Sequence, residues 1–129
     1  MPQTTAIYGE TSRLLDMFIQ DTRRVDGRGL GGLLYNTSGL KIAYNLQTSG
    51  AWVPVTLVTM TFNSWASGGF IEEDATNALG WYQFGLPNAA LAQNVKSVKV
   101  HIAGAANMTP IPILIELAPG IAAAVVVRG

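Results

Sequence analysis

The chain has 129 residues, a length typical of one domain, and 49% of them are hydrophobic, which is enough for a sizeable core. Eight basic residues balance eight acidic ones, so the chain lacks the basic excess that nucleic-acid binding requires. The absence of cysteine excludes disulfides, thiolate metal sites and thiol catalysis. Only 12% of the residues are charged, about half of the usual ~25%, which is typical of a protein whose surface is covered by neighbours in an assembly.

The first eleven residues have a weak strand pattern, and we expect residues 1–11 to form an N-terminal arm. Beyond them, apolar and polar residues alternate in short runs separated by turn-forming residues, a pattern that predicts β-strands. The predicted strands cover residues 13–21, 40–46, 52–62, 80–86, 97–104 and 109–117. Proline residues in the third and last of these runs indicate sheet edges, because proline has no N–H to donate to a neighbouring strand.

The inward positions of these strands form the predicted core. It comprises Ile42, Tyr44, Tyr82, Phe84, Leu86, Val98, Val100, Ile102, Ile113 and Ile115. Residues 87–94 contain the only helical pattern, a short segment that opens with proline and closes with asparagine. The sequence therefore predicts an all-β protein, an antiparallel β-sandwich over residues 12–118 with one short helix.

A G-x-G-x-x-G motif occurs at Gly27, Gly29 and Gly32, the spacing of a dinucleotide-binding loop. That function needs a buried strand before the motif, a helix after it and an acidic residue ~20 positions further on. A polar segment precedes this motif, turn-forming residues follow it, and Trp52 stands near the acidic position. We therefore predict a loop in which glycines supply positive φ and leucines 30, 33 and 34 contact the core, with no cofactor.

Other candidate sites are weak. Arg13, Arg23, Arg24 and Arg28 lie among Asp16, Asp21 and Asp26, which favours a solvated mixed-charge surface over an anion site. His101, the only histidine, occupies an outward strand position without a neighbouring carboxylate. The acidic run Glu72, Glu73 and Asp74 lacks the further alternating ligands of a calcium loop, so we predict no metal.

Tryptophans 52, 65 and 81 fit interface or core anchors better than a sugar-stacking platform. Of these, Trp52 and Trp65 are the predicted partner contacts. We expect no membrane contact, because the chain begins without a signal-peptide pattern and has no apolar run of ~18 residues.

Asp74, Asn77 and Gly80 are predicted to have a structural role in a turn. Aspartate and asparagine side chains can accept hydrogen bonds from nearby backbone N–H groups, and glycine can adopt a positive φ. We expect that positive φ at Gly80.

The segment after residue 118 is apolar and follows Pro119-Gly120. We interpret residues 119–129 as a C-terminal arm that contacts a neighbouring chain through Ile121, Val125, Val126 and Val127. A final strand of the same domain and a disordered tail are the alternatives.

The stretch "SWASGGFIEEDATNALGWYQFGLPNAAL" (residues 64–91) is the most distinctive of the chain. It resembles a module of tailed-bacteriophage structural proteins, in which a "SGGF-E-DATN-PG-Y-L-LP-AAL" pattern precedes "GAANM-P". Upstream, "LGGLLYNTSGLKIAY" is similar to the "GL-YNTSGL-A-Y" of that module, so the resemblance spans roughly residues 14–117. The chain has Leu79 where the module often has proline. The matching residues are Ser67, Gly68, Gly69, Phe70, Glu72, Asp74, Ala75, Thr76, Asn77, Gly80, Tyr82, Leu86, Pro87, Ala89, Ala90, Leu91, Gly104, Ala105, Ala106, Asn107, Met108 and Pro110.

The resemblance implies an immunoglobulin-like β-sandwich and a non-enzymatic structural protein of the phage virion. Its expected role is a capsid decoration (cement) protein, or another head-attached accessory, that binds neighbouring virion proteins such as the major capsid or tail proteins and forms a homo-oligomer. The alternative is a tail-fibre or baseplate module that recognises a host receptor or carbohydrate. The resemblance transfers no catalytic residue, cofactor or metal ligand, although a small glycan-acting enzyme remains a third interpretation.

Overall fold

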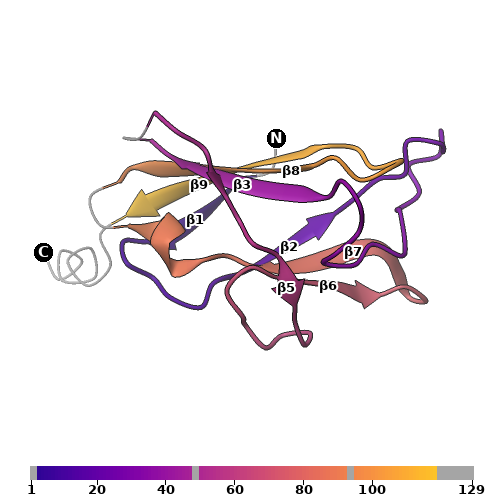
Figure 1. The fold of residues 1–129 in the computed structure, drawn as a ribbon, viewed down its shortest axis with the longest axis horizontal. Helices are drawn as coiled ribbons and strands as arrows, with labels where there is room; N and C mark the ends of the chain where they lie inside the picture. Colours follow the sequence, from indigo (N-terminus) through magenta and orange to yellow (C-terminus); the bar gives the residue numbers. More distant parts are fainter. Residues whose placement is uncertain (1–2, 48–49, 93–94, 119–129) are drawn as a thin grey trace, which may run out of the picture.

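The computed structural model describes residues 3–47, 50–92 and 95–118, and in this part of the chain nine strands form two sheets (Figure 1). Sheet A has the strand order β1-β9-β8-β3-β4, and sheet B has the order β2-β7-β6-β5. The strands are β1 (Gln3–Ile7), β2 (Leu14–Phe18), β3 (Lys41–Leu46), β4 (Val53–Pro54), β5 (Val58–Thr59), β6 (Gly69–Asp74), β7 (Ala78–Gly85), β8 (Ser97–Ala103) and β9 (Ile111–Ala118). The predicted all-β class is confirmed.

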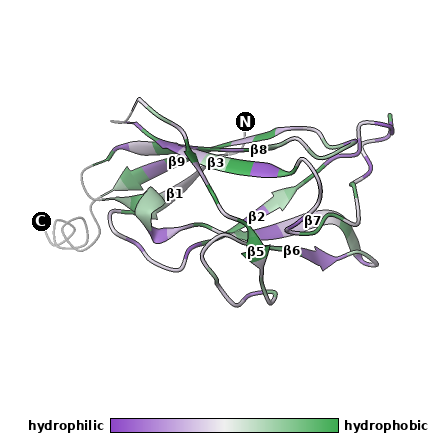
Figure 2. Ribbon diagram, in the orientation of Figure 1, coloured by the Kyte–Doolittle hydropathy of each residue, from purple (hydrophilic) through white to green (hydrophobic). Residues whose placement is uncertain are grey.

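The two sheets share one core, which contains alternate residues of the strands of both layers. Figure 2 shows hydrophobic residues along strands of both sheets. All ten predicted core residues, from Ile42 to Ile115, are buried. Leu15, Met17 and Ile19 of the first predicted strand are buried with them. Each large apolar side chain of this kind stabilises the fold by about 1.5–3 kcal/mol, and because the strand period is two, their common burial fixes the register of each strand.

The sheets are mixed, so the prediction of a purely antiparallel arrangement is wrong. β1 pairs with β9 in parallel, and β5 pairs with β6 in parallel. The other described strand pairs are antiparallel. β1 lies in sheet A and is followed by β2 in sheet B, so its partner β9 comes from the other end of the chain. The loop after β5 leads back to the start of that strand, so β6 runs in the same direction beside it.

The expected N-terminal arm does not stand apart from the domain over the part that the structure describes. Residues 3–7 form β1, which is paired with β9 from Leu114 to Ala118. Ala6 is buried in the common core. The polar threonines weaken the strand pattern in the sequence, yet the unpaired edge of β9 supplies hydrogen-bond partners for this segment.

The predicted strand over residues 52–62 divides into two short strands that belong to different sheets. β4 forms the edge of sheet A, and Pro54 ends it, as the missing N–H of proline predicts. The chain then crosses to sheet B, where β5 forms the edge opposite to β2. The second proline-containing strand, β9, also has an open edge at its start, since β1 pairs with it only from Leu114 onward.

The predicted helix over residues 87–94 is shorter than expected. A single 3-10 turn covers Asn88–Leu91 after Pro87, and Ala90 and Leu91 are buried. Residues 93–94 lie outside the described chain. Among the described residues, no helix is long and apolar enough to cross a membrane.

Candidate functional site

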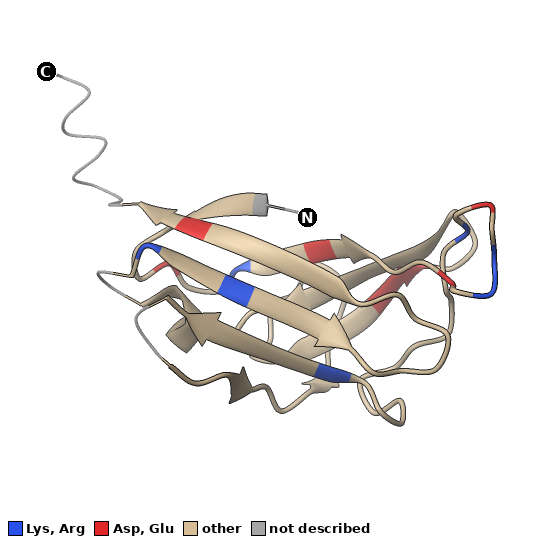
Figure 3. Ribbon diagram, turned by 90° about the horizontal axis from the view of Figure 1, so that it is seen from above, with Lys and Arg blue, Asp and Glu red and all other residues tan. Residues whose placement is uncertain are grey.

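The long connection from β2 to β3 contains the glycine motif and most of the charged residues at one end of the molecule (Figure 3). Its first part doubles back on itself, because the N–H of Asp21 donates to the carbonyl of Arg28 at 2.9 Å and the N–H of Leu30 donates to that of Ile19 at 2.8 Å. Thr22 and Gln20 exchange backbone hydrogen bonds with the β8–β9 turn at Asn107 and Thr109. The connection therefore closes this end of the core.

Two side chains of sheet B hold the glycine-rich segment. The Tyr82 hydroxyl donates to the carbonyl of Leu30 at 2.7 Å and accepts from the N–H of Leu33 at 3.2 Å. The Glu72 carboxylate accepts from the N–H of Gly32. Burial raises the pKa of Tyr82 to about 12. The N–H groups that would bind a phosphate in a nucleotide-binding loop are thus used to attach this loop to β6 and β7.

The predicted behaviour of the loop is right in part. Gly27 and Gly32 have positive φ values of +79° and +85°. Leu30 and Leu33 are buried as expected, but the prediction for Leu34 is wrong, because it is 58% exposed. Leu34 begins a turn, in which its N–H donates to the Thr37 hydroxyl at 2.7 Å and its carbonyl accepts from the Thr37 N–H at 3.0 Å.

The middle glycine of the motif has a packing role. An ideal Cβ on Gly80 of β7 would lie 2.5 Å from the Cα of Gly29, so the two backbones touch. A side chain at Gly29 would in turn meet the backbone of Leu79 and Gly80. Gly80 also has φ +99°, the positive value that the sequence analysis expected.

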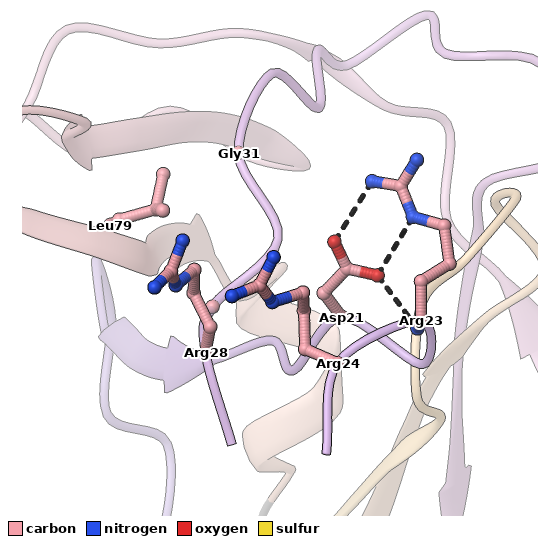
Figure 4. Close-up of a pocket in the computed structure, with 7 residues that line it drawn as sticks. Asp21, Arg23, Arg24, Arg28, Gly31 and Leu79 are labelled. Carbon is pink, nitrogen blue, oxygen red and sulfur yellow. Dashed lines mark hydrogen bonds and ion pairs between the residues drawn. The ribbon is translucent and has the colours of Figure 1, made fainter. Parts of the chain in front are cut away.

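An open pocket of about 520 Å³ lies beside this contact (Figure 4). It is lined by Asp21, Arg23, Arg24, Arg28, Gly29, Gly31 and Leu79. Arg23 donates to both carboxylate oxygens of Asp21, at 3.0 Å from Nε and 2.8 Å from Nη2, and its backbone N–H donates to the same carboxylate. These hydrogen bonds lower the pKa of Asp21 to about 2.

The other two arginines of the pocket share Asp26. Arg24 Nη2 lies 3.2 Å and Arg28 Nη2 lies 3.6 Å from Asp26 Oδ2. The hydrogen bond from Arg24, followed by that from the Arg28 backbone, lowers the pKa of Asp26. Each guanidinium of the pocket thus has a carboxylate partner within the loop, an arrangement that favours the mixed-charge surface over an anion site.

A second hollow, of about 230 Å³, lies between the two sheets where β2 faces the start of β9. Phe18 and Trp81 form one wall, with ring centroids 5.9 Å apart, and are 38% and 41% exposed. Buried Met17, Ile111 and Ile113 line the rest with Asp16. We call these six residues the seam groove. Trp81 and Leu79 occupy successive outward positions of β7, so the arginine pocket and the seam groove border the same strand.

Polar side chains adjoin the seam groove on the outer face of sheet B. Gln83 Nε2 donates to Asp16 Oδ1 at 3.1 Å and to Asn63 Oδ1 at 3.0 Å. Burial and the nearby Asp16 carboxyl raise the pKa of Glu73 to about 7. Glu73 Oε2 is buried without a hydrogen-bond partner among the described residues. In the sequence, Asp16 and Glu73 occupy ordinary outward strand positions, so the pattern does not predict that their carboxyl groups lie close together.

The acidic run and the following turn have separate roles. Asp74 Oδ1 accepts from the N–H groups of Thr76 and Asn77, each at 3.0 Å, and Asp74 Oδ2 accepts from Asn77 Nδ2 at 2.8 Å. These bonds, first those from Asn77, lower the pKa of Asp74. Within the described chain, no group of three potential metal-ligating side chains comes together.

Trp52 and His101 meet on the outer face of sheet A, far along the sequence from each other. Their ring centroids lie 6.4 Å apart in an edge arrangement, and Lys99 Nζ lies 5.6 Å from the centre of the Trp52 ring. With Ala43 they line an apolar hollow of about 400 Å³. Trp65, the other predicted partner contact, is half-buried and its Nε1 donates to the Leu86 carbonyl at 3.0 Å.

The predicted C-terminal contacts Ile121, Val125, Val126 and Val127 lie outside the described residues, as does the whole of 119–129. The seam groove was missed in the sequence analysis. Its one available signal was the outward aromatic residue in each of two strands, Phe18 and Trp81. Their pairing across β2 and β7 depends on tertiary structure.

Comparisons with family models, curated proteins and solved structures found no match to this chain.

Proposed function

We propose that the protein is a non-enzymatic structural component of a phage virion, a capsid decoration protein or other head-attached accessory that binds neighbouring virion subunits. The resemblance of residues 14–117 to the phage module supports the virion assignment. On this proposal, the two-sheet domain is a variant of the immunoglobulin-like sandwich in which the edges carry parallel strands.

One structural observation favours a role in assembly: the apolar seam groove opens between two strand edges. Aromatic residues beside buried aliphatic ones are typical of the centres of protein interfaces. The charged residues of the arginine pocket, by contrast, have partners within their own loop. The described surface therefore offers apolar contact area for a protein at the seam groove.

The test is the abundance of the protein in purified particles of the virus that encodes it. Quantitative mass spectrometry against the major capsid protein should give hundreds of copies per particle, located on the head by electron microscopy. A count of a few to dozens, with density on the tail, would instead support the alternative. Absence from the particle would contradict both assignments.

The alternative is a tail-fibre or baseplate module that recognises a receptor or carbohydrate, and the hollow at Trp52 and His101 favours it. An exposed indole next to an imidazole and a lysine could stack on a sugar ring and donate hydrogen bonds to it. Glycan-array binding that is lost in Trp52→Ala and retained in Trp81→Ala would support this alternative. Hydrolysis of a glycan by the purified protein would overturn the non-enzymatic assignment.

A further inference from the structure

Among the strands that the structure describes, none pairs with the outer edge of β2. β2 is the edge strand of sheet B, and its bonds to β7 are flanked by Leu86 N–H donating to the Arg13 carbonyl and Ile19 N–H donating to the Gly80 carbonyl. Because antiparallel pairing alternates, the backbone groups of Leu14, Asp16 and Phe18 point away from β7. These groups border the seam groove, whose other rim is the open edge of β9 before Leu114.

A second copy of β2 is a poor occupant of this edge. In an antiparallel pair centred on the middle of the strand, two Asp16 side chains would face each other, and like charges directly opposite are destabilising. An occupant that fits must present apolar side chains to Phe18, Trp81 and Ile113. Any charged group that it places next to Asp16 must be positive.

The chain contains one segment outside the described structure with this composition. Residues 121–127 read IAAAVVV, seven apolar residues rich in valine, and Arg128 is the only charged residue after Glu116. In extended form seven residues span roughly 23 Å, enough to cover the five residues of β2. Valine favours strands, and small alanines permit a close approach of two backbones.

The geometry favours a segment from another molecule. The described chain ends at Ala118, and the seam groove lies at the other end of β9, at Ile111 and Ile113. β1 is paired with β9 along the intervening edge, from Leu114 to Ala118. A segment of the same molecule would have to reverse after Ala118 and pass outside β1, whereas a segment from a neighbour meets no such obstacle.

We propose that residues 121–127 of one copy of this chain pair with the outer edge of β2 in a second copy and fill its seam groove. The proposal rests on the assembly role given above and names the contact that would join the copies. Each copy has one segment and one groove, so the pairing produces either a reciprocal dimer or a head-to-tail ring or chain of subunits.

The test uses two full-length variants with complementary defects, studied by sedimentation velocity. Val126→Asp damages the apolar segment and leaves the groove intact, while Trp81→Ser damages the groove and leaves the segment intact. We expect the intact chain to self-associate and each variant to associate at least about tenfold more weakly, the effect of losing a central interface contact. Mixing the two variants should restore a heterodimer, because one intact segment then meets one intact groove.

Tyr35→Ser is the matched control, because this aromatic residue is 39% exposed, close to the 41% of Trp81, and lies in the β2–β3 connection outside the seam groove. It should leave self-association unchanged. A synthetic peptide of residues 119–129 should compete with self-association, and the same peptide with N-methyl groups at alternate residues should not, because it cannot supply the strand hydrogen bonds.

Several outcomes would overturn the proposal. An intact chain that stays monomeric at high concentration contradicts it, as does association that survives Val126→Asp. Association that survives Val126→Asp but not Trp81→Ser indicates a symmetric groove-to-groove contact. Loss of association in both variants without recovery on mixing indicates that the segment occupies the groove of its own molecule. Each of these results leaves the virion assignment open, because that is measured independently in the particle.

Discussion

The arginine pocket and the seam groove border the same strand, β7. They differ in how many of their groups have interaction partners within the chain. At the pocket, each guanidinium has a carboxylate partner, and the glycine-rich backbone donates to Tyr82 and Glu72. At the groove, no strand of the described chain pairs with the outward backbone groups of Leu14, Asp16 and Phe18, and the rings of Phe18 and Trp81 are partly exposed. The comparison shows that a dense cluster of charge can be a closed structural element, whereas the apolar seam groove is the surface that we propose for a partner.

The largest expected effect is on the glycine contact that closes the pocket end. Gly80→Ala should lower the free energy of unfolding by about 2–4 kcal/mol, because alanine resists φ +99° and its Cβ would meet the Cα of Gly29. Gly32→Ala is the control, since Gly32 has a similar φ of +85° and open space around it. That variant should lose only about 1 kcal/mol. Equal losses in urea denaturation would show that the contact with Gly29 contributes nothing.

The next effect concerns the hydroxyl that attaches the loop. Tyr82→Phe removes both the donor to Leu30 and the acceptor from Leu33, and it leaves buried backbone groups unpaired. We expect a loss of about 1–3 kcal/mol in the free energy of unfolding, with faster hydrogen exchange at the Leu33 amide. Tyr44→Phe, at another buried tyrosine in the core, should cost less than about 1 kcal/mol. A Tyr82 variant as stable as the Tyr44 variant would contradict the role of this bridge.

These two sites show what can be read from the sequence. The period-two pattern identified the predicted core residues of β3, β7, β8 and β9, because each of these strands has one face on the core. The turn-forming residues after the glycine motif correctly predicted that no helix follows Gly32. The contact of Gly29 with Gly80 could not be predicted, because it joins backbone segments that approach only when β2 and β7 pair.

The same limit applies at the edges of the sheets. β1 was hidden because threonine breaks the apolar alternation, and its partner strand lies at the other end of the sequence. The run from Trp52 to Phe62 looks like one strand because its composition is uniform, while Pro54 and the crossing between sheets divide it. The seam groove depends on the first of these two features, since one rim of the groove is the part of β9 that β1 leaves unpaired.

A smaller effect should appear in the pH dependence of stability. The pKa of Glu73 is raised to about 7 in the folded protein from 4.5, so the folded state holds its proton more tightly than the unfolded state. This contribution is fully present below about pH 4.5 and is lost as the pH rises towards 7. Because the side chain is partly exposed, solvent screening should limit the loss to less than about 1 kcal/mol.

Glu73→Gln should therefore be more stable than the parent at pH 8 and nearly equal to it at pH 4, as measured by thermal unfolding across this range. A parent whose stability rises between pH 5 and 7 relative to the variant would mean that Glu73 is stabilised as a carboxylate. A cation from the proposed partner segment would have the same effect in the assembled state, so the comparison should be made on the Val126→Asp background.

The smallest effect is expected at the arginine pocket itself, although it holds the highest density of charge. Arg24 and Arg28 share Asp26 at distances of 3.2 and 3.6 Å, and all three side chains are exposed to solvent. Exposed ion pairs contribute about 0–1 kcal/mol, so Arg24→Gln and Asp26→Asn should each change the free energy of unfolding by less than about 0.5 kcal/mol, and less still at high salt. Because Asp26 already neutralises part of this charge, inorganic phosphate should raise the melting temperature of the parent and of an Arg24→Gln, Arg28→Gln double variant equally. A larger rise in the parent would show that the pocket binds anions, and the contrast between a closed pocket and an open groove would then fail at the pocket.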